Sequence, residues 1–216
     1  MVHHFSCLSR WSFALICANV ALHHVYAGGI LESQVMKDTM SGKFLYFAYG
    51  SNLLAQRILI NNPSAVRAGT AKLNDYRLDF VGHSKLWNGA PSTIVPLPGK
   101  HVWGALWMLD DADKENLDRQ EGVHTNTYFP LEVQVTSNDG KVMTARTYRQ
   151  TAEIEELVDL SKLPNERCPS ATYLNTILKG AKESSLPDEY QELLRAIRHN
   201  GYVVTGEIAE RLNLEM

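Results

Sequence analysis

The chain has little cysteine. Its 216 residues include three cysteines, Cys7, Cys17 and Cys168, and two of these lie within the first seventeen residues. The remainder of the chain therefore has one thiol, which excludes a disulfide framework in that part of the protein. A zinc site built from several cysteines is excluded there for the same reason.

Neither sign of charge dominates the sequence. Lysine and arginine number 21, aspartate and glutamate number 24, and the formal net charge is −3. The charges are mixed along the chain, without the basic block that indicates a nucleic-acid partner and without an acidic tail. We therefore expect no nucleic-acid binding and a partner that is a small molecule. The hydrophobic fraction of 44% is sufficient for a core of ordinary size.

The common catalytic motifs are also missing. The sequence contains no Gly-x-Ser-x-Gly elbow, no P-loop, no dinucleotide-binding fingerprint and no His-Glu-x-x-His motif. The eight histidines are scattered, and half of them lie before residue 25. Their spacing matches no metal-binding motif, so no metal site is predicted.

The first part of the chain differs in composition from the rest. Residues 1–31 contain no acidic side chain and one arginine, Arg10. An apolar stretch over residues 11–22 is too short to span a bilayer, and a small-residue pattern follows it at Val25 and Ala27. This layout is typical of a secretory signal peptide that is cleaved near Ala27.

A downstream start of translation is the alternative to a signal peptide. Initiation at Met36 or Met40 would give a protein without the leader. In either case, residues 1–40 are treated as a leader or flexible N-terminus, and residues 41–216 are predicted to form one domain. No membrane segment is expected in the mature form.

Most of the predicted strands precede most of the predicted helices in this domain. We predict strands over residues 43–49, 65–73, 76–81, 101–108, 127–136 and 141–150. Helices are predicted over residues 53–60, 110–121, 169–182, 187–199 and 204–214. This order favours an α+β fold, with a small mixed or antiparallel β-barrel and peripheral helices.

A possible anion-binding turn follows the first predicted strand. The strand ends in Gly50-Ser51-Asn52 directly before a helix, which leaves several backbone N–H groups pointing outward. Such a turn can hold a carboxylate or a developing oxyanion, and Gly50 allows a ligand to approach closely. The alternative is that these residues only turn the chain and cap the helix, which is the more common role of such a pattern taken alone.

Glu121 is an acidic residue at an unusual place, the last turn of a predicted helix. Its carboxylate there faces the negative end of the helix dipole. This position, together with any burial, would raise its pKa toward the range of a general base. The alternative is an exposed glutamate before the capping residue Gly122, and the pattern alone favours it.

Three tyrosines lie on or near the ends of predicted elements. These are Tyr128, Tyr148 and Tyr173. Tyrosines at such positions usually form the edge of the core, with the ring buried and the hydroxyl near water. We assign them this role by default.

Together these segments resemble the γ-glutamylcyclotransferase family, over roughly residues 43 to 200. The Tyr-Gly-Ser-Asn and Gln-Glu-Gly stretches, in this order and about seventy residues apart, are a specific pair. The matching segments are Phe44-Leu-Tyr-Phe-Ala-Tyr-Gly-Ser-Asn-Leu53, Asn62-Pro-Ser-Ala65, Val102-Trp-Gly104, Leu117-Asp-Arg-Gln-Glu-Gly-Val123, Gly180-Ala-Lys-Glu183, Leu186-Pro187 and Glu189-Tyr-Gln191.

The resemblance implies a fold, an activity and a set of site residues. The fold is a small mixed barrel with helices around it, usually a homodimer, without a cofactor. The activity converts a γ-glutamyl amino acid to 5-oxoproline and a free amino acid, a step of glutathione metabolism. The residue that matches the catalytic base is Glu121. The residues that match the substrate-binding loop and pocket are Tyr46, Phe47, Ala48, Tyr49, Gly50, Ser51, Asn52 and Tyr173.

Some parts of the chain depart from the family pattern. Residues 151–168, which precede Tyr173, and the tail after residue 200 are divergent, which affects acceptor specificity more than the reaction itself. The leader is foreign to a family that generally acts in the cytosol. The resemblance therefore implies a cytoplasmic protein, and use of the leader would imply the secretory pathway.

Three other functions remain open at this point. The first is a cyclotransferase specific for glutathione or for γ-glutamyl amines, although the glutathione-specific group resembles Tyr-Gly-Ser-Leu where this chain has Asn52. The second is an enzyme with Ser51 as nucleophile, although the chain lacks the second glycine of the elbow and a nearby Asp/His pair. The third is a domain that binds a γ-glutamyl ligand or a protein without turnover.

Overall fold

The structure is a computed structural model that describes residues 41–206, 210 and 212. The chain divides into two units, Met1–Gly42 and Lys43–Met216, and the second carries all the elements described below. The leader predicted over residues 1–40 lies outside the described residues, so its two interpretations stay predictions. Within the described part, no helix is long and apolar enough to cross a membrane.

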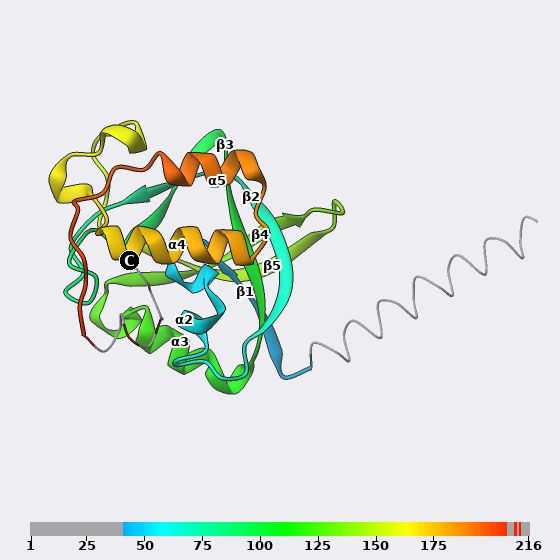
Figure 1. The fold of residues 1–216 in the computed structure, drawn as a ribbon. Helices are drawn as coiled ribbons and strands as arrows, with labels where there is room; N and C mark the ends of the chain where they lie inside the picture. Colours follow the sequence, from blue (N-terminus) through cyan, green and yellow to red (C-terminus); the bar gives the residue numbers. More distant parts are fainter. Residues whose placement is uncertain (1–40, 207–209, 211, 213–216) are drawn as a thin grey trace, which may run out of the picture. The chain divides into compact units, whose positions relative to one another are not determined.

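The second unit is built on a closed barrel (Figure 1). Around the barrel the order is β1, β3, β2, β4, β5, and neighbouring strands are antiparallel except where β5 meets β1. The strands are β1 (Lys43–Ala48), β2 (Val66–Phe80), β3 (Ser92–Asp110), β4 (Tyr128–Ser137) and β5 (Val142–Gln150). The predicted fold class, a small mixed barrel with peripheral helices, is confirmed.

Two strands are longer than predicted. The sequence indicates a break between residues 73 and 76, but β2 continues through it as a bulge at Asp75, whose φ is 60°. Such a bulge bends a strand without ending it. Strand β3 likewise begins earlier than predicted, at Ser92, which pairs with Phe80. It contains Pro96 and Pro98, which lie next to the irregularity in its pairing with β2, where a strand tolerates proline.

Short helices occupy the connections between strands, and two longer helices follow the barrel. The α-helices are α2 (Ala55–Ile58), α3 (Lys114–Gln120), α4 (Ala171–Glu183) and α5 (Asp188–Arg195). The 3₁₀-helices are η1 (Ser51–Leu53), η2 (Asp111–Asp113), η3 (Val123–Thr125), η4 (Leu160–Lys162) and η5 (Asn165–Arg167). The helix predicted over residues 53–60 is shorter, because Leu54 has an extended backbone (φ −83°, ψ 124°). The helix predicted over 204–214 falls largely outside the described residues.

Helix α4 presses closely on the segment that follows β1. A side chain at Gly180 would place its Cβ 2.4 Å from the backbone nitrogen of Leu54, so only glycine fits there. Helix α4 therefore holds the turn at Gly50–Leu53 in place, and α5 packs against α4 (Figure 1).

Asp79 is a fully buried charge near one end of the barrel. Its carboxylate lies 2.9 Å from the guanidinium of Arg77 and 2.5 Å from that of Arg167. Arg167 also donates hydrogen bonds to the carbonyl oxygens of Phe80 and Glu156. This cluster therefore fastens the segment after β5 to β2.

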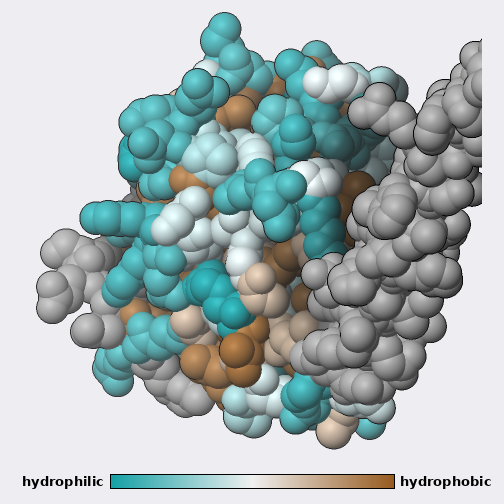
Figure 2. Space-filling view, turned by 90° about the vertical axis from the view of Figure 1, so that its right-hand side faces the viewer, coloured by the Kyte–Doolittle hydropathy of each residue, from teal (hydrophilic) through white to brown (hydrophobic). Residues whose placement is uncertain are grey.

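Large hydrophobic residues remain exposed at scattered places. Figure 2 shows a face that is mostly hydrophilic, with hydrophobic side chains at several places on it, most of them in its lower half. The exposed large hydrophobic residues are Leu59, Val66, Leu86, Val142, Leu157, Leu193 and Tyr202. Isolated exposure of this kind is normal for a folded protein and does not by itself mark a site.

We expect Asp79→Ala to lower the free energy of unfolding by about 3 kcal/mol, because it leaves two largely buried guanidinium groups without their carboxylate. The measurement is equilibrium unfolding in urea. The control is Lys43→Met, which breaks the exposed pair of Lys43 with Asp110 and should cost less than about 1 kcal/mol. Equal effects of the two substitutions would contradict this account of the cluster.

Candidate active site

A cavity lies where the chain leaves β1. Its enclosed part has a volume of about 40 Å³, which is room for a few atoms of a ligand. Its side chains come from segments far apart in the sequence, and a single carboxylate is among them. The lining residues are Tyr46, Tyr49, Gly50, Ser51, Asn52, Ser92, Glu121, Tyr128, Tyr148 and Tyr173.

The turn after β1 presents unpaired backbone donors. The carbonyl oxygens of Gly50 and Ser51 accept hydrogen bonds from the backbone N–H groups of Leu53 and Leu54, which forms η1. The N–H groups of Gly50 and Ser51 themselves donate to no group among the described residues. Both residues line the cavity, so these donors are available to an anion there.

Gly50 is required by the closeness of its neighbours. A Cβ at this position would lie 2.4 Å from the Ser92 hydroxyl and 3.1 Å from the Tyr173 hydroxyl. Those two hydroxyls are hydrogen-bonded to each other at 2.9 Å. The turn, the start of β3 and the start of α4 therefore meet at this one residue, and any side chain would separate them.

Asn52 holds the carboxylate of Glu121. The Asn52 amide donates to Glu121 Oε1 at 3.0 Å and to the Tyr46 hydroxyl at 3.1 Å. The Gln120 amide in turn donates to the Asn52 side-chain oxygen at 3.0 Å. The Asn52 side chain is buried, so this network has one arrangement, and it leaves the second oxygen of Glu121 free of these bonds.

Glu121 is the capping residue directly after α3. Its backbone is still helical, and Gly122 after it is left-handed with φ 68°, which turns the chain away from the helix axis. Burial among the tyrosine rings raises the pKa of the Glu121 carboxyl to about 7, against the opposing charge of Arg57 and the hydrogen bonds from Gln120 and Asn52. A group with this pKa exchanges a proton readily near neutral pH.

The tyrosines of the cavity are neutral, and two of their hydroxyls are held by hydrogen bonds to backbone carbonyl oxygens. Tyr128 donates to the Ser92 carbonyl oxygen at 2.6 Å, and Tyr49 donates to the Tyr148 carbonyl oxygen at 2.6 Å. Burial raises the pKa of Tyr46, Tyr49, Tyr128 and Tyr173 above the ordinary value, and the nearby Glu121 adds to this. These hydroxyls therefore keep their protons wherever Glu121 titrates.

Tyr148 belongs to a second network behind the cavity. Its hydroxyl donates to Asp118 at 2.5 Å and accepts a hydrogen bond from Arg146 at 2.9 Å. Arg146 also pairs with Asp118 through both carboxylate oxygens. Asp118 lies in α3, so this network joins β5 to the helix that carries Glu121 at its end.

Seven of the residues expected at the site come together around the cavity. They are Tyr46, Tyr49, Gly50, Ser51, Asn52, Glu121 and Tyr173. Phe47 and Ala48 do not line it: both are fully buried, and the Phe47 ring packs against Gly104 of β3. Tyr173 lies within the first turn of α4, capped by Ser170, and does not precede that helix.

Three further residues line the cavity, Ser92, Tyr128 and Tyr148, which the sequence does not predict as site residues. Tyr128 and Tyr148 were assigned to the core edge, and their position at element ends was the only signal for them. Ser92 gave no signal, because a serine after a proline in a loop has no distinctive pattern. Within the described residues, no group of three or more His, Cys, Asp and Glu side chains is placed to hold a metal ion.

Comparison with known proteins gives consistent results. Residues 101–194 match the model of the AIG2-like family. The chain is 42% identical over 173 residues to the Bos taurus and Homo sapiens proteins named gamma-glutamylcyclotransferase, a region covering 78% of this chain and 85% of each of those proteins. A solved structure named gamma-glutamyl cyclotransferase has 40% identity and a TM-score of 0.69, covering 79% of this chain and 96% of that one.

We expect Glu121→Gln to stabilise the protein at high pH and not at low pH. The folded-state pKa is raised from 4.5 to about 7, so the stability that goes with protonated Glu121 is present below pH 4.5 and lost as the pH rises through about 7. A glutamine does not ionise and avoids this loss. The stability difference between variant and wild type should therefore grow over this interval by at most about 3 kcal/mol.

Urea unfolding at several pH values between 4.5 and 8 measures this difference. Glu115→Gln is the control, because Glu115 is an exposed glutamate in the same helix. Its stability difference from wild type should stay nearly constant with pH. A constant difference for Glu121→Gln as well would show that the Glu121 carboxylate has an ordinary pKa.

Proposed function

This chain belongs to the γ-glutamylcyclotransferase family and is an enzyme of that type, and we propose that the carboxylate of Glu121 is its catalytic base. The enzyme converts γ-glutamyl amino acids to 5-oxoproline and a free amino acid. The observation that supports the role of Glu121 is its place in the cavity: it is the one carboxylate there, held by Asn52 and next to the unpaired donors of Gly50 and Ser51.

The substrate carries its own nucleophile. The α-amine of the γ-glutamyl group attacks the γ-carbonyl carbon and closes a five-membered ring. Intramolecular reactions of this kind reach effective molarities on the order of 10⁵–10⁸ M when the reacting groups are aligned. The protein therefore has to hold the folded-back substrate and manage two protons rather than supply a nucleophile.

Glu121 can manage both protons in turn. Near neutral pH the α-amine is an ammonium group, and the ionised Glu121 carboxylate takes its proton. The free amine then attacks the carbonyl carbon, and the carbonyl oxygen becomes an oxyanion. Protonated Glu121 delivers its proton to the departing amine nitrogen, and the oxyanion re-forms the carbonyl as the C–N bond breaks. The re-ionised Glu121 then carries the excess proton of the ring nitrogen to the released amine, which leaves as an ammonium group. The products are 5-oxoproline and the free amino acid, and Glu121 is ionised again.

The turn after β1 is suited to the negative charges of this reaction. The backbone N–H groups of Gly50 and Ser51 can donate to the substrate carboxylate or to the developing oxyanion, and one such donor is typically worth about 2.7–4 kcal/mol. The hydroxyl of Tyr173, close to Gly50, and those of the other cavity tyrosines are neutral donors that can position the remaining polar atoms. These assignments to Tyr46, Tyr49, Gly50, Ser51, Asn52 and Tyr173 are part of the proposal.

The alternative functions have less support. A serine nucleophile requires a base hydrogen-bonded to it, but no histidine lines the cavity, and the Glu121 carboxylate is hydrogen-bonded to Asn52 and Gln120 rather than to Ser51. The glutathione-specific alternative is not favoured, because Asn52 stands where that group resembles leucine, and it supports Glu121 here. The relatives with 42% identity carry the broader name.

The assembly and the cellular location are proposed on the family resemblance. We propose a homodimer, as in the family generally. We propose action in the cytosol if translation begins at Met36 or Met40, and entry into the secretory pathway if the leader ending near Ala27 is used. Mass spectrometry of the mature N-terminus separates the last two.

We expect Glu121→Gln to lower kcat/KM for γ-glutamyl-alanine by about 10²–10⁴-fold, because the proton transfers lose their carrier. In the wild type, kcat/KM should fall as the pH drops below about 7, since protonated Glu121 cannot accept the ammonium proton. Chromatographic measurement of 5-oxoproline gives both results. The control is Glu115→Gln, which should behave as wild type. Near-normal turnover by a folded Glu121→Gln variant would remove Glu121 from the mechanism.

Substrate preference is a separate prediction. We expect kcat/KM for γ-glutamyl-alanine to exceed that for glutathione and for γ-glutamyl-lysine by about tenfold or more, a range that pocket contacts can supply. The three substrates are compared at one pH by release of 5-oxoproline. Faster turnover of glutathione would contradict the preference and leave the role of Glu121 intact. Binding of all three without conversion would contradict the enzymatic function itself.

A further inference from the structure

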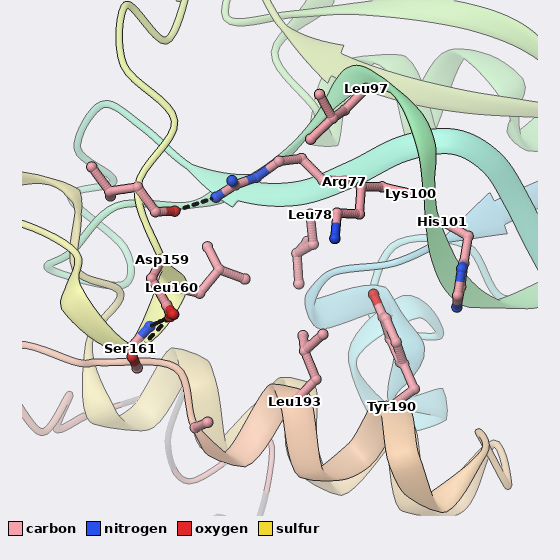
Figure 3. A pocket seen from close by; sticks show the side chains of 12 residues that line it. Arg77, Leu78, Leu97, Lys100, His101, Asp159, Leu160, Ser161, Tyr190 and Leu193 are labelled. Carbon is pink, nitrogen blue, oxygen red and sulfur yellow. Dashed lines mark hydrogen bonds between the residues drawn. The ribbon is translucent and has the colours of Figure 1, made fainter.

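A second cavity lies between α5, the strands β2 and β3, and the segment after β5. It has a volume of about 290 Å³, close to the lower end of ligand sites, which run from about 300 to 1,000 Å³. Its lining is partly apolar and partly polar (Figure 3). The apolar residues are Leu78, Leu97, Val158, Leu160, Leu193 and Ala196, and the polar residues are Arg77, Lys100, His101, Asp159, Ser161 and Tyr190. We call it the α5 cavity. It shares no residue with the candidate active site.

The α5 cavity is formed by irregular backbone that is held in place. Strands β2 and β3 pair at Asn74 with His101 and again at Tyr76 with Pro96, so residues 97–100 bulge out of the sheet. The Asp75 carboxylate accepts a hydrogen bond from the backbone of Gly99 at 2.9 Å, which fixes this bulge. Bulges of this kind often aim side chains into functional sites, and this one carries Lys100.

The opposite wall of the α5 cavity is fastened from two sides. Arg77 donates to the carbonyl oxygen of Val158 at 2.7 Å, and the backbone of Arg198 donates to that of Leu160 at 2.9 Å (Figure 3). The Asp159 carboxylate caps the short helix η4 by accepting a hydrogen bond from the backbone N–H of Ser161. The wall belongs to residues 158–161, and these hydrogen bonds hold it in place. The cavity is therefore preformed.

Two polar groups of the α5 cavity, on Tyr190 and Lys100, are available to bind a ligand. The Tyr190 side chain is only 6% exposed, and its buried hydroxyl has no hydrogen-bond partner of good geometry among the described residues. Burial raises the pKa of this hydroxyl, and the nearby backbone of Trp103 opposes the rise. Lys100 takes part in no ion pair within the described part of the chain. A buried hydroxyl without a partner costs free energy, which a ligand atom can recover.

The charges of the lining select an anion. The Arg77 guanidinium is already paired with Asp79, and the Asp159 carboxylate accepts hydrogen bonds from the backbone N–H and the hydroxyl of Ser161. Burial and the neighbouring Lys72 and Lys100 lower the pKa of His101, so its imidazole is a neutral donor or acceptor near pH 7. Lys100 is then the cation that remains for a ligand, beside an apolar space.

We propose that the α5 cavity binds a small carboxylate with an apolar body, its carboxylate on Lys100 and the Tyr190 hydroxyl and its body against Leu78, Leu160 and Leu193. The volume suits a ligand of about ten non-hydrogen atoms. Figure 3 shows the Tyr190 hydroxyl pointing away from α5, toward the strands that carry Leu78 and Lys100. The two polar groups thus lie at the strand side of the cavity, with the leucines around them.

Octanoate is the probe for this site, and binding to the full chain is measured by isothermal titration calorimetry. We expect saturable binding of one octanoate per chain, and binding at least about tenfold weaker for uncharged octan-1-ol, because Lys100 then lacks its partner. Lys100→Met should weaken octanoate binding by a similar factor. The matched control Lys114→Met removes an exposed lysine of α3 and should change nothing.

Tyr190→Phe separates a ligand contact from a structural role. Without ligand the variant should be as stable as wild type or more so, because it removes an unpaired buried hydroxyl, yet it should bind octanoate several-fold more weakly. On binding, the imidazole resonances of His101 should shift in proton NMR, and those of His124 should not. None of the Lys100, Lys114 and Tyr190 variants should alter release of 5-oxoproline.

The proposal is overturned by any of three results. These are no saturable octanoate binding at millimolar concentration, equal affinities for octanoate and octan-1-ol, and equal affinities of the Lys100→Met and Lys114→Met variants. The test is independent of the catalytic proposal, because Glu121→Gln should bind octanoate as the wild type does. Loss of turnover and loss of octanoate binding are thus separate failures.

Discussion

The site depends on a half-buried carboxylate whose surroundings oppose its ionisation without preventing it. Burial among tyrosine rings opposes ionisation of Glu121, while the charge of Arg57 and the hydrogen bonds from Gln120 and Asn52 favour it. The balance places its pKa at about 7, where either protonation state is accessible. A stronger counter-charge would leave the group too weak a base, and deeper burial alone would keep it protonated. The tyrosines withdraw the carboxylate from solvent and remain neutral themselves.

The barrel provides the rigidity that this balance needs. Glu121 follows α3 and Asn52 follows β1, so two separate elements have to meet within hydrogen-bond distance, while Ser92 at the start of β3 is hydrogen-bonded to Tyr173 of α4. They can do so because glycine allows two close approaches, at Gly50 beside Ser92 and at Gly180 beside Leu54. The network of Asp118 with Arg146 and Tyr148 ties α3 to β5 on the other side. The base is therefore positioned by packing throughout the domain.

The same scaffold carries a second cavity in its least regular region. There the bulge at Asp75 and the segment after β5 depart from the regular barrel. The buried ion pairs of Asp79 with Arg77 and Arg167 join this segment to β2. The active site is lined mainly by residues of β1, the turn after it, the end of the α3 region and α4, whereas the α5 cavity is lined by β2, β3, α5 and the segment after β5. Two cavities with no residue in common therefore lie on one barrel.

The sequence alone determined the strands and helices that have clear periodicity, the barrel class, and the pair of motifs around Gly50 and Glu121. These follow from local patterns, because hydrophobic spacing and turn residues act over a few positions. Tertiary structure decided that Phe47 and Ala48 face the core, that β2 runs through Asp75, and that Ser92, Tyr128 and Tyr148 complete the cavity. It also decided the pKa of Glu121. Burial and hydrogen bonding are properties of groups brought together in space, and no local pattern records them.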